Sequence, residues 1–218
     1  NNIHLNQKIL YIDSKKKIII TEKENIKYNH LISSIPLNEL CKIIKNIPKK
    51  VKKASSQLRY TSGVLVSLGF KKKINSEMWF YIYNKNIKAA RVHSPSLKSP
   101  RNAPKGCSSL QAEIYLNKDE KIDKKKLKEI ENNTIKSLIK MNLFEEDDII
   151  VRDTRYVKYA NVVFDKKIYY NRQIVRSFLN KCKIFSVGRF GEWEYLWSDQ
   201  AFLSGKKAAD QIIKSEIS

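Results

Sequence analysis

The run Gly188-Arg-Phe-Gly-Glu-Trp-Glu-Tyr195 carries the most specific pattern in the sequence. It follows a short apolar stretch at 184–187, which predicts a β-strand that ends at the first glycine. A helix is expected to begin near Ser198 or Asp199 and to place small residues on one face, namely Ala201, Gly205 and Ala208, followed by Ile212. The pattern therefore predicts a strand, a glycine turn, an aromatic loop and a helix.

This turn and helix start suit an electron-rich ligand. Gly188 and Gly191 allow the main chain to approach a ligand closely, because neither residue has a Cβ. The N–H groups of a first helical turn, together with the positive end of the helix dipole, favour negative charge. An ordinary strand-turn-helix would have the same pattern, so the sequence alone leaves both interpretations open.

Strand-like stretches dominate the rest of the chain. β-Branched and aromatic residues mark strands at 8–12, 18–20, 31–35, 63–68, 78–83, 89–94, 109–116, 149–157 and 160–164. Helical spacing occurs at 37–48, at 123–141 with Asp123 as the N-cap, and at 171–180. Without a regular βαβ rhythm, these elements predict an α+β fold with a mostly antiparallel sheet and flanking helices. The longest irregular stretch, 94–106, is expected to be a lid or a surface crossing.

The positive charge of the chain is spread along the sequence. Of the 218 residues, 43 are Lys or Arg and 22 are Asp or Glu, which gives a net charge of +21. A nucleic-acid surface would gather these residues on one face, with arginines for phosphates and aromatics for stacking. Here the lysine runs at 15–17, 49–53, 71–73 and 124–126 separate the predicted elements. A lysine-rich surface explains them, so we expect no nucleic-acid partner, although attraction to anionic substrates stays possible.

The cysteines, histidines and apolar runs argue against a disulfide-rich, a metal-binding and a membrane-spanning protein. The three cysteines and three histidines are far apart, which predicts neither a disulfide framework nor a metal site. No apolar run approaches the roughly 20 residues of a membrane helix, and no signal-peptide pattern opens the chain. A soluble, cytoplasmic protein without a bound metal is predicted.

The opening run resembles a family motif. Together with Ser198-Asp-Gln-Ala201 and Ser204-Gly205-Lys-Lys-Ala-Ala209, it resembles the C-terminal FAD motif of the flavin amine oxidase and protoporphyrinogen oxidase superfamily, in particular its UDP-galactopyranose-mutase-like members. Weaker similarities occur at 28–36, 58–60 and 99–113, so the resemblance covers nearly the whole chain. It implies a FAD cofactor and the C-terminal strand-helix of a Rossmann-like FAD domain.

The resemblance also implies a division into three segments. Residues 1–36 would be a β-element remaining from the FAD domain, residues 37–180 a substrate-binding domain, and residues 181–218 the returning strand-helix of the FAD domain. The family holds the FAD pyrophosphate with an N-terminal GxGxxG, which the six glycines here do not form. With Asn as residue 1, we expect a fragment that lacks its N-terminal FAD-binding half, binds FAD weakly or not at all, and is inactive alone.

Residue-by-residue comparison with the family motif assigns the site. It implies that Gly188, Arg189, Phe190 and Gly191 line the flavin and that Asp199, Gln200 and Ala201 meet it at the helix start. Trp193 and Tyr195 occupy aromatic positions that face substrate in the mutases, and Arg91 is a candidate anion ligand. The chain departs from the mutase pattern at Trp193, where tyrosine is usual, and at Trp197-Ser198, where an acidic residue and Met are usual. These departures argue against a sugar-nucleotide substrate.

Three classes of function stay open at this point. The first is a FAD-dependent oxidoreductase in which a small-molecule substrate gives a hydride to the flavin N5. The second is a non-redox sugar-nucleotide mutase in which reduced flavin attacks a sugar carbon while Arg189, Tyr195 and Arg91 hold diphosphate oxygens. The third is a non-catalytic basic binding module. No protein nucleophile stands out, and the flavin would carry the chemistry in the first two classes.

Overall fold

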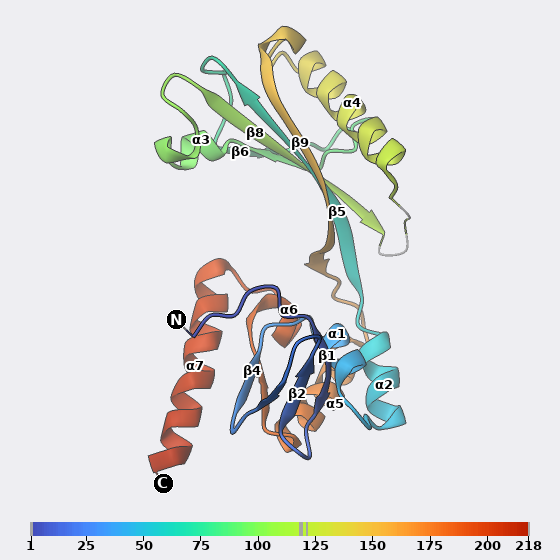
Figure 1. Cartoon of the computed structure of the whole chain (residues 1–218). Helices are drawn as coiled ribbons and strands as arrows, with labels where there is room; N and C mark the ends of the chain where they lie inside the picture. Colours follow the sequence, from blue (N-terminus) through green and yellow to red (C-terminus); the bar gives the residue numbers. More distant parts are fainter. Residues whose placement is uncertain (1, 118–119, 121, 218) are drawn as a thin grey trace. The chain divides into compact units, whose positions relative to one another are not determined.

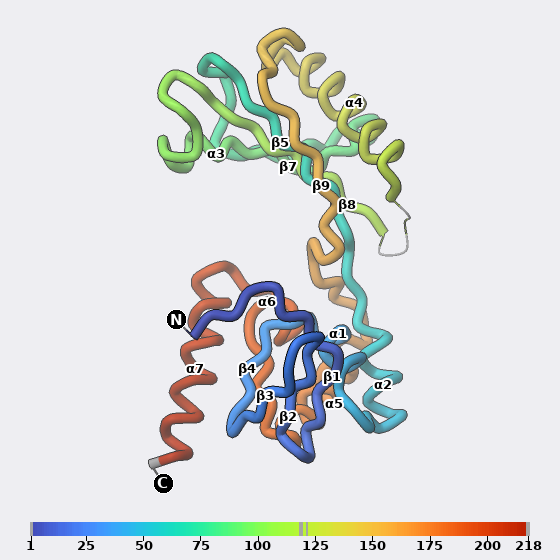
Figure 2. Tube along the Cα trace, viewed as in Figure 1, coloured from blue at the N-terminus to red at the C-terminus, as the bar shows by residue number. Residues whose placement is uncertain are grey.

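The computed structural model describes residues 2–117, 120 and 122–217, which divide into two compact units. Unit 1 joins the chain up to Arg59 with the chain from Val162 onward, and unit 2 is Tyr60–Asn161. Figure 2 shows the blue N-terminal and orange-to-red C-terminal segments of unit 1 lying side by side. Among the described residues, no helix is both long enough and apolar enough to cross a membrane.

Unit 2 is built on a five-stranded sheet. Its strands are β5 (Tyr60–Phe70), β6 (Trp79–Tyr81), β7 (Arg91–His93), β8 (Ser108–Asn117) and β9 (Ile149–Val162). They follow the order β6-β7-β8-β5-β9. β5 pairs antiparallel with β8 from Thr61 to Phe70, and β7 pairs antiparallel with both β6 and β8. Short helical segments, α3 (Pro95–Lys98), η1 (Pro100–Asn102) and η2 (Glu146–Asp148), lie in the connections.

Helix α4 (Lys124–Lys140) covers one face of this sheet, as Figure 1 shows. The Asp123 carboxylate accepts a hydrogen bond from the Lys126 N–H at 2.7 Å, which confirms the predicted N-cap. Burying each large apolar side chain contributes roughly 1.5–3 kcal/mol before entropic costs. The core beneath the helix includes Val64, Val66, Leu68, Leu110, Ala112, Ile114, Ile130, Ile135 and Leu138.

Unit 1 contains two small sheets. β1 (Ile9–Asp13), β2 (Ile18–Thr21) and β3 (Asn25–Lys27) form an antiparallel sheet in chain order. β4 (Leu31–Ser33) pairs in parallel with β10 (Ile184–Ser186). This pairing joins the two chain segments of unit 1, and it delivers the glycine turn that follows β10 to one end of the two-stranded sheet.

Five helices complete unit 1. They are α1 (Leu37–Ile43), α2 (Lys49–Ser56), α5 (Ile168–Lys181), α6 (Gly188–Glu192) and α7 (Ser198–Ile217). Helix α2 packs against α1 and α5, and α6 packs against α7. The buried apolar residues of α1, α2 and α5 are Leu37, Leu40, Cys41, Val51, Ala54, Ile168, Val175 and Leu179.

The α+β prediction is confirmed, with differences in local structure. The sequence predicts two strands at 149–157 and 160–164, whereas β9 continues to Val162. It continues because the Tyr159 ring lies 4.3 Å from the Tyr60 ring and the Asn161 N–H donates to Thr61 Oγ1. The residues of α2 were expected to be a solvated lysine run and not a helix. In the structure they form a helix that buries Val51 and Ala54, which lie three positions apart on one face.

The two units differ in extent from the predicted segments. The predicted segment 37–180 contains all of unit 2, but residues 37–59 and 162–180 belong to unit 1. The physical reason is the packing of α2 against α5, which holds these flanking stretches together. The substrate-binding role of the segment stays a prediction.

Candidate functional site

The predicted flavin segment forms a corner between β10 and α7, which we call the α6–α7 corner (residues 188–201). Gly188 has a φ of 78°, in the left-handed region that favours glycine. Its N–H donates to Ser204 Oγ of α7 at 2.7 Å, which ties the turn to the long helix. Apart from its chain neighbours and the adjacent backbone of α6, no described heavy atom lies within 4 Å of the position that a Gly188 Cβ would take. The main chain at Gly188 is therefore fixed in place and open on one side.

Gly191 has a packing role in the same corner. A Cβ at Gly191 would lie 3.3 Å from the Ser33 carbonyl oxygen and 3.6 Å from the Ser186 carbonyl carbon. These atoms belong to β4 and β10, so the absence of a side chain lets α6 sit directly on the parallel pair. The two glycines thus act differently: Gly188 permits the turn, and Gly191 permits the close approach to the sheet.

Arg189 spans the loop between α6 and α7. Its Nε donates to the Leu196 carbonyl at 2.8 Å, and its guanidinium carbon lies 4.8 Å from the centre of the Tyr195 ring. A guanidinium at this distance over an aromatic ring makes a favourable cation–π contact. The interaction orders the loop and keeps a positive charge beside the exposed face of Tyr195.

Trp193 lies in the core of unit 1. It is completely buried, and it has a φ of 56° at the C-terminal end of α6. Its ring meets Phe190 edge to face at 5.9 Å. A bulky residue with positive φ is rare, which indicates that the surrounding packing fixes this conformation. Tyr195, the other aromatic residue expected to face substrate, is 54% exposed.

The start of α7 has a defined cap. Gln200 Oε1 accepts a hydrogen bond from the Trp197 N–H at 2.8 Å, and the Ala201 N–H donates to the Trp197 carbonyl. Trp197 is therefore the N-cap and Gln200 the third residue of α7, and this side-chain contact is one of the two hydrogen bonds of a capping box. Asp199 is exposed at this end, where negative charge stabilises the helix dipole. Sequence reasoning assigned Gln200 to the cofactor and missed this capping role.

Exposed apolar side chains gather around the same helix start. The fractional exposures are 63% for Trp197, 75% for Phe202 and 47% for Leu203, next to the exposed Tyr195. Contiguous exposed apolar surface marks binding sites more often than a single exposed residue does. Sequence reasoning did not select Trp197, Phe202 or Leu203, although the period of α7 places Phe202 and Leu203 away from its small-residue face.

Comparison with solved structures identifies the fold. UDP-galactopyranose mutase, in its reduced form, superposes with a TM-score of 0.84 at 22% identity, over 95% of this chain and 46% of the other. This chain shares the fold of about half of UDP-galactopyranose mutase. A protoporphyrinogen oxidase-like protein from Exiguobacterium sp. 255-15 matches at a TM-score of 0.67 and 11% identity, over 95% and 48% of the two chains.

A third solved structure extends this group. The CLA-producing fatty acid isomerase from P. acnes matches at a TM-score of 0.61 and 13% identity, over 94% of this chain and 47% of the other. The chain thus spans about half the length of each of these structures. No protein-family model and no curated protein matches the sequence. At the level of the fold, these neighbours confirm the resemblance inferred from the α6–α7 corner.

The α6–α7 corner fits a flavin ring by three observations. The Gly188 turn is open on one side, exposed aromatic rings flank the start of α7, and the N–H groups of residues 198–200 lie at a helix start, where N–H groups have no acceptor within the helix. A planar ring system with partial negative charge would match these features. The residues that would hold it are those at 188–191 and 198–201. A hollow of about 270 Å³ lies beside the turn, lined in part by Ser186, Val187 and Ser204.

Arg91, the predicted anion ligand, belongs to unit 2. It lies on the sheet face opposite α4, where Glu113 stands directly across from it on β8. Arg91 Nη2 donates to Glu113 Oε1 at 2.5 Å, Tyr115 Oη donates to Glu113 Oε2 at 2.5 Å, and His93 Nδ1 lies 3.7 Å from Oε1. The structure therefore gives Arg91 a carboxylate partner within its own unit.

These contacts shift several pKa values. Burial would raise the pKa of Glu113, but hydrogen bonds from Arg91 and Tyr115 outweigh it, and the pKa lies below its ordinary value. The pKa of Arg91 is raised, mainly by its hydrogen bond to Glu113. Burial, followed by the charge of Lys98, lowers the pKa of His93, so the imidazole is neutral at pH 7. The cluster is thus a neutralised ion pair with two polar neighbours.

Substituting Glu113→Gln should make the stability of unit 2 less dependent on pH. Because folding lowers the pKa of Glu113, its contribution is complete above its ordinary value of 4.5 and is lost as the pH falls through the lower folded-state value. At pH 7 the substitution should cost about 1–3 kcal/mol, since Arg91 loses a charged partner. Urea denaturation at pH 7 and in mild acid measures both effects, and an unchanged acid dependence would contradict this assignment.

Proposed function

We propose that this chain forms the ring-binding and substrate-binding part of a FAD-dependent oxidoreductase. The main support for this proposal is the α6–α7 corner, where an open glycine turn, a helix N-terminus and exposed aromatic rings occur together. Such a corner suits a planar cofactor that gains negative charge when it is reduced. A bound flavin would supply hydride-accepting chemistry, which explains why no nucleophilic protein residue is needed.

The residues of the corner would act by position and electrostatics. The first turn of α7 would place its N–H groups against an electron-rich edge of the ring and stabilise charge there. Tyr195 and Trp197 would cover apolar surface and exclude water from the reacting face. Arg189, held by the Leu196 carbonyl, would keep a fixed positive charge beside Tyr195.

The pyrophosphate of FAD needs a second element. No spacing among the six glycines of this chain forms GxGxxG, the motif that places a pyrophosphate on a helix N-terminus. We infer that an element outside these 218 residues, joined to the chain or separate from it, supplies that contact. The chain alone should therefore contact the flavin ring and bind the nucleotide part weakly.

A non-redox mutase is the second candidate. It is favoured by the TM-score of 0.84 to UDP-galactopyranose mutase and by Arg189 stacked on Tyr195. The apolar Trp197, at a position where an acidic residue is usual, and the engagement of Arg91 by Glu113 both favour the oxidoreductase.

Prior reduction of the flavin separates the two candidates. The chain, supplied with the element that contacts the pyrophosphate and with saturating FAD, should be assayed for conversion of UDP-galactopyranose with and without dithionite. The oxidoreductase proposal predicts no conversion in either state, because no redox step is offered. Conversion that requires reduced flavin would replace it with the mutase, and absence of any flavin binding would favour a non-catalytic module.

A further inference from the structure

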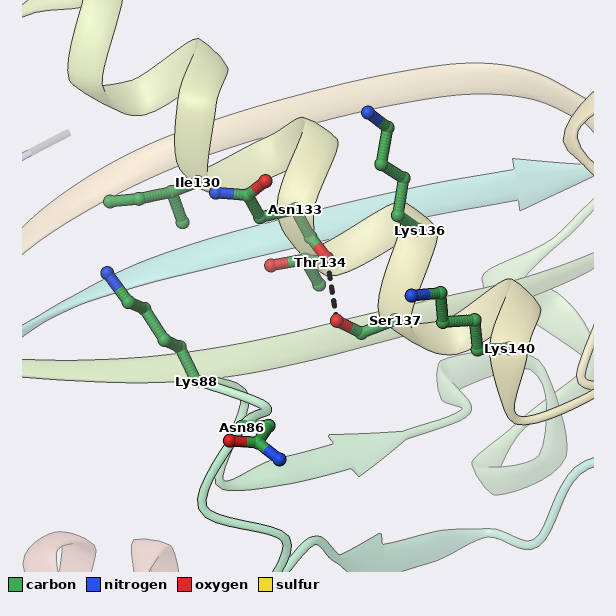
Figure 3. A pocket seen from close by; sticks show the side chains of 8 residues that line it. All are labelled: Asn86, Lys88, Ile130, Asn133, Thr134, Lys136, Ser137 and Lys140. Atoms are coloured by element: carbon green, nitrogen blue, oxygen red, sulfur yellow. Dashed lines mark hydrogen bonds between the residues drawn. The ribbon is translucent and has the colours of Figure 1, made fainter.

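The described residues that line a small pocket in unit 2 include three lysines and no acidic residue. It lies between α4 and the turn that precedes β7 and has a volume of about 240 Å³ (Figure 3). The lysines are Lys88 from the turn and Lys136 and Lys140 from the helix, with the amides of Asn86 and Asn133 beside them. We call this the lysine pocket. Its volume is below the roughly 300 Å³ of pockets for drug-sized ligands, so its ligand is small.

The two walls of the lysine pocket are held by one core. Lys88 lies between Ile87, which packs against the core of unit 2, and Ala89, which is 1% exposed. On the helix, the neighbours Ile135 and Leu138 are buried in the same core. The backbone positions of the lysines are therefore fixed relative to one another. Figure 3 shows Lys88 rising from the turn beside the helix and the Lys140 amine directed toward Ser137, whereas the Lys136 amine points away from the other labelled side chains.

The charge along α4 is divided into two halves. In the first half, Lys126 and Lys128 form ion pairs with Glu129 and Glu131. The second half, 132–140, contains no Asp or Glu. Within the described part of the chain, Lys88, Lys136 and Lys140 form no ion pair with a carboxylate. The helix dipole favours a lysine in the last turn, but it does not account for Lys88, which comes from another segment.

Neutral groups of the pocket add hydrogen-bond capacity. The side-chain amides of Asn86 and Asn133 carry N–H donors. Ser137 Oγ donates to the Asn133 carbonyl at 2.8 Å, which leaves the hydroxyl oxygen only as an acceptor, for instance from a protonated anion. Ammonium groups and amides around a small hollow match a tetrahedral anion with several oxygens.

We propose that the lysine pocket binds a phosphate group, either free phosphate or the phosphate of a small metabolite. A bound phosphate would give these lysines the anionic partner that no described carboxylate supplies. The pocket is a local depression with lysines from only two segments, which fits a single phosphate better than an extended polyanion. This site is independent of the flavin proposal, because all its residues belong to unit 2.

Titration of the whole chain with inorganic phosphate, by calorimetry at constant ionic strength, tests the proposal. The double variant Lys88→Gln with Lys140→Gln should bind phosphate at least about tenfold more weakly than the wild type. The matched control, Lys124→Gln with Lys125→Gln, removes the same charge from the first turn of α4 and should change affinity less than about twofold. Circular dichroism melts of both variants check that the fold is retained.

Three outcomes would overturn the proposal. One is equal weakening in both double variants, which would indicate attraction by net charge only. Another is the absence of saturable phosphate binding by the wild type. The third is binding of phosphatidic acid vesicles or single-stranded RNA that depends on Lys88 and Lys140 while free phosphate does not bind, which would assign the lysines to a macromolecular surface.

Discussion

Substituting Trp193→Ala should lower the free energy of unfolding by about 3–5 kcal/mol. Trp193 is 0% exposed, and its ring packs edge to face against Phe190. Removing a buried aromatic ring loses its transfer free energy and leaves a cavity that the surroundings fill only in part. Urea denaturation followed by far-UV circular dichroism measures the change. The predicted cost exceeds that of any other single substitution considered for this chain.

Trp197→Ala provides the matched control. The two tryptophans lie four residues apart, but Trp197 is 63% exposed, so its removal should change stability by less than about 0.5 kcal/mol. A small cost at Trp193 would mean that its ring faces a ligand, as the family resemblance implies. Equal costs at the two positions would contradict the packing role assigned to Trp193.

Substituting Gly188→Val should weaken flavin binding by about tenfold or more. Gly188 has a φ of 78° and open space where its Cβ would be, so a valine would project two methyl groups into the place proposed for the ring. The strained backbone should also cost about 1–3 kcal/mol of stability. Quenching of flavin fluorescence measures binding, and a thermal melt measures stability.

Gly106→Val is the control for backbone strain. Gly106 has a φ of 83°, and no described atom lies within 4 Å of its Cβ position, but it belongs to unit 2. Its substitution should cause a similar loss of stability and leave flavin binding within about twofold of the wild type. If both substitutions weakened flavin binding equally, the effect would come from strain and the ring would not lie at Gly188.

Local patterns in the sequence predicted much of the fold. Asp123 predicted the start of α4 correctly, because its carboxylate accepts a hydrogen bond from a backbone N–H of the first helical turn. The content of β-branched and other apolar residues predicted the central strands β5 and β8, whose alternate residues face the α4 core and the opposite side. The α2 helix was missed because four of its eight residues are lysines, and its burial depends on α5, more than a hundred residues away.

The candidate site was only partly predictable, because part of it also depends on contacts between residues far apart in the sequence. The glycine spacing indicated the turn at Gly188, since glycine adopts a positive φ without steric cost. The burial of Trp193 depends on how α6 lies on β4 and β10, a long-range contact that residue spacing does not encode. Similarly, the pairing of Arg91 with Glu113 depends on the register of β7 against β8, which the sequence does not specify.

The central claim is that this chain carries the ring-facing side of a FAD site at the α6–α7 corner. Amide chemical shifts of the ¹⁵N-labelled chain, recorded with FAD and with lumiflavin at about 1 mM, test it most directly. At that concentration contacts worth about 4 kcal/mol are half occupied. The account predicts that both ligands shift the amides of 188–191 and 198–201 to a similar extent, because only the ring is held. Shifts confined to other residues, or none with either ligand, would contradict it.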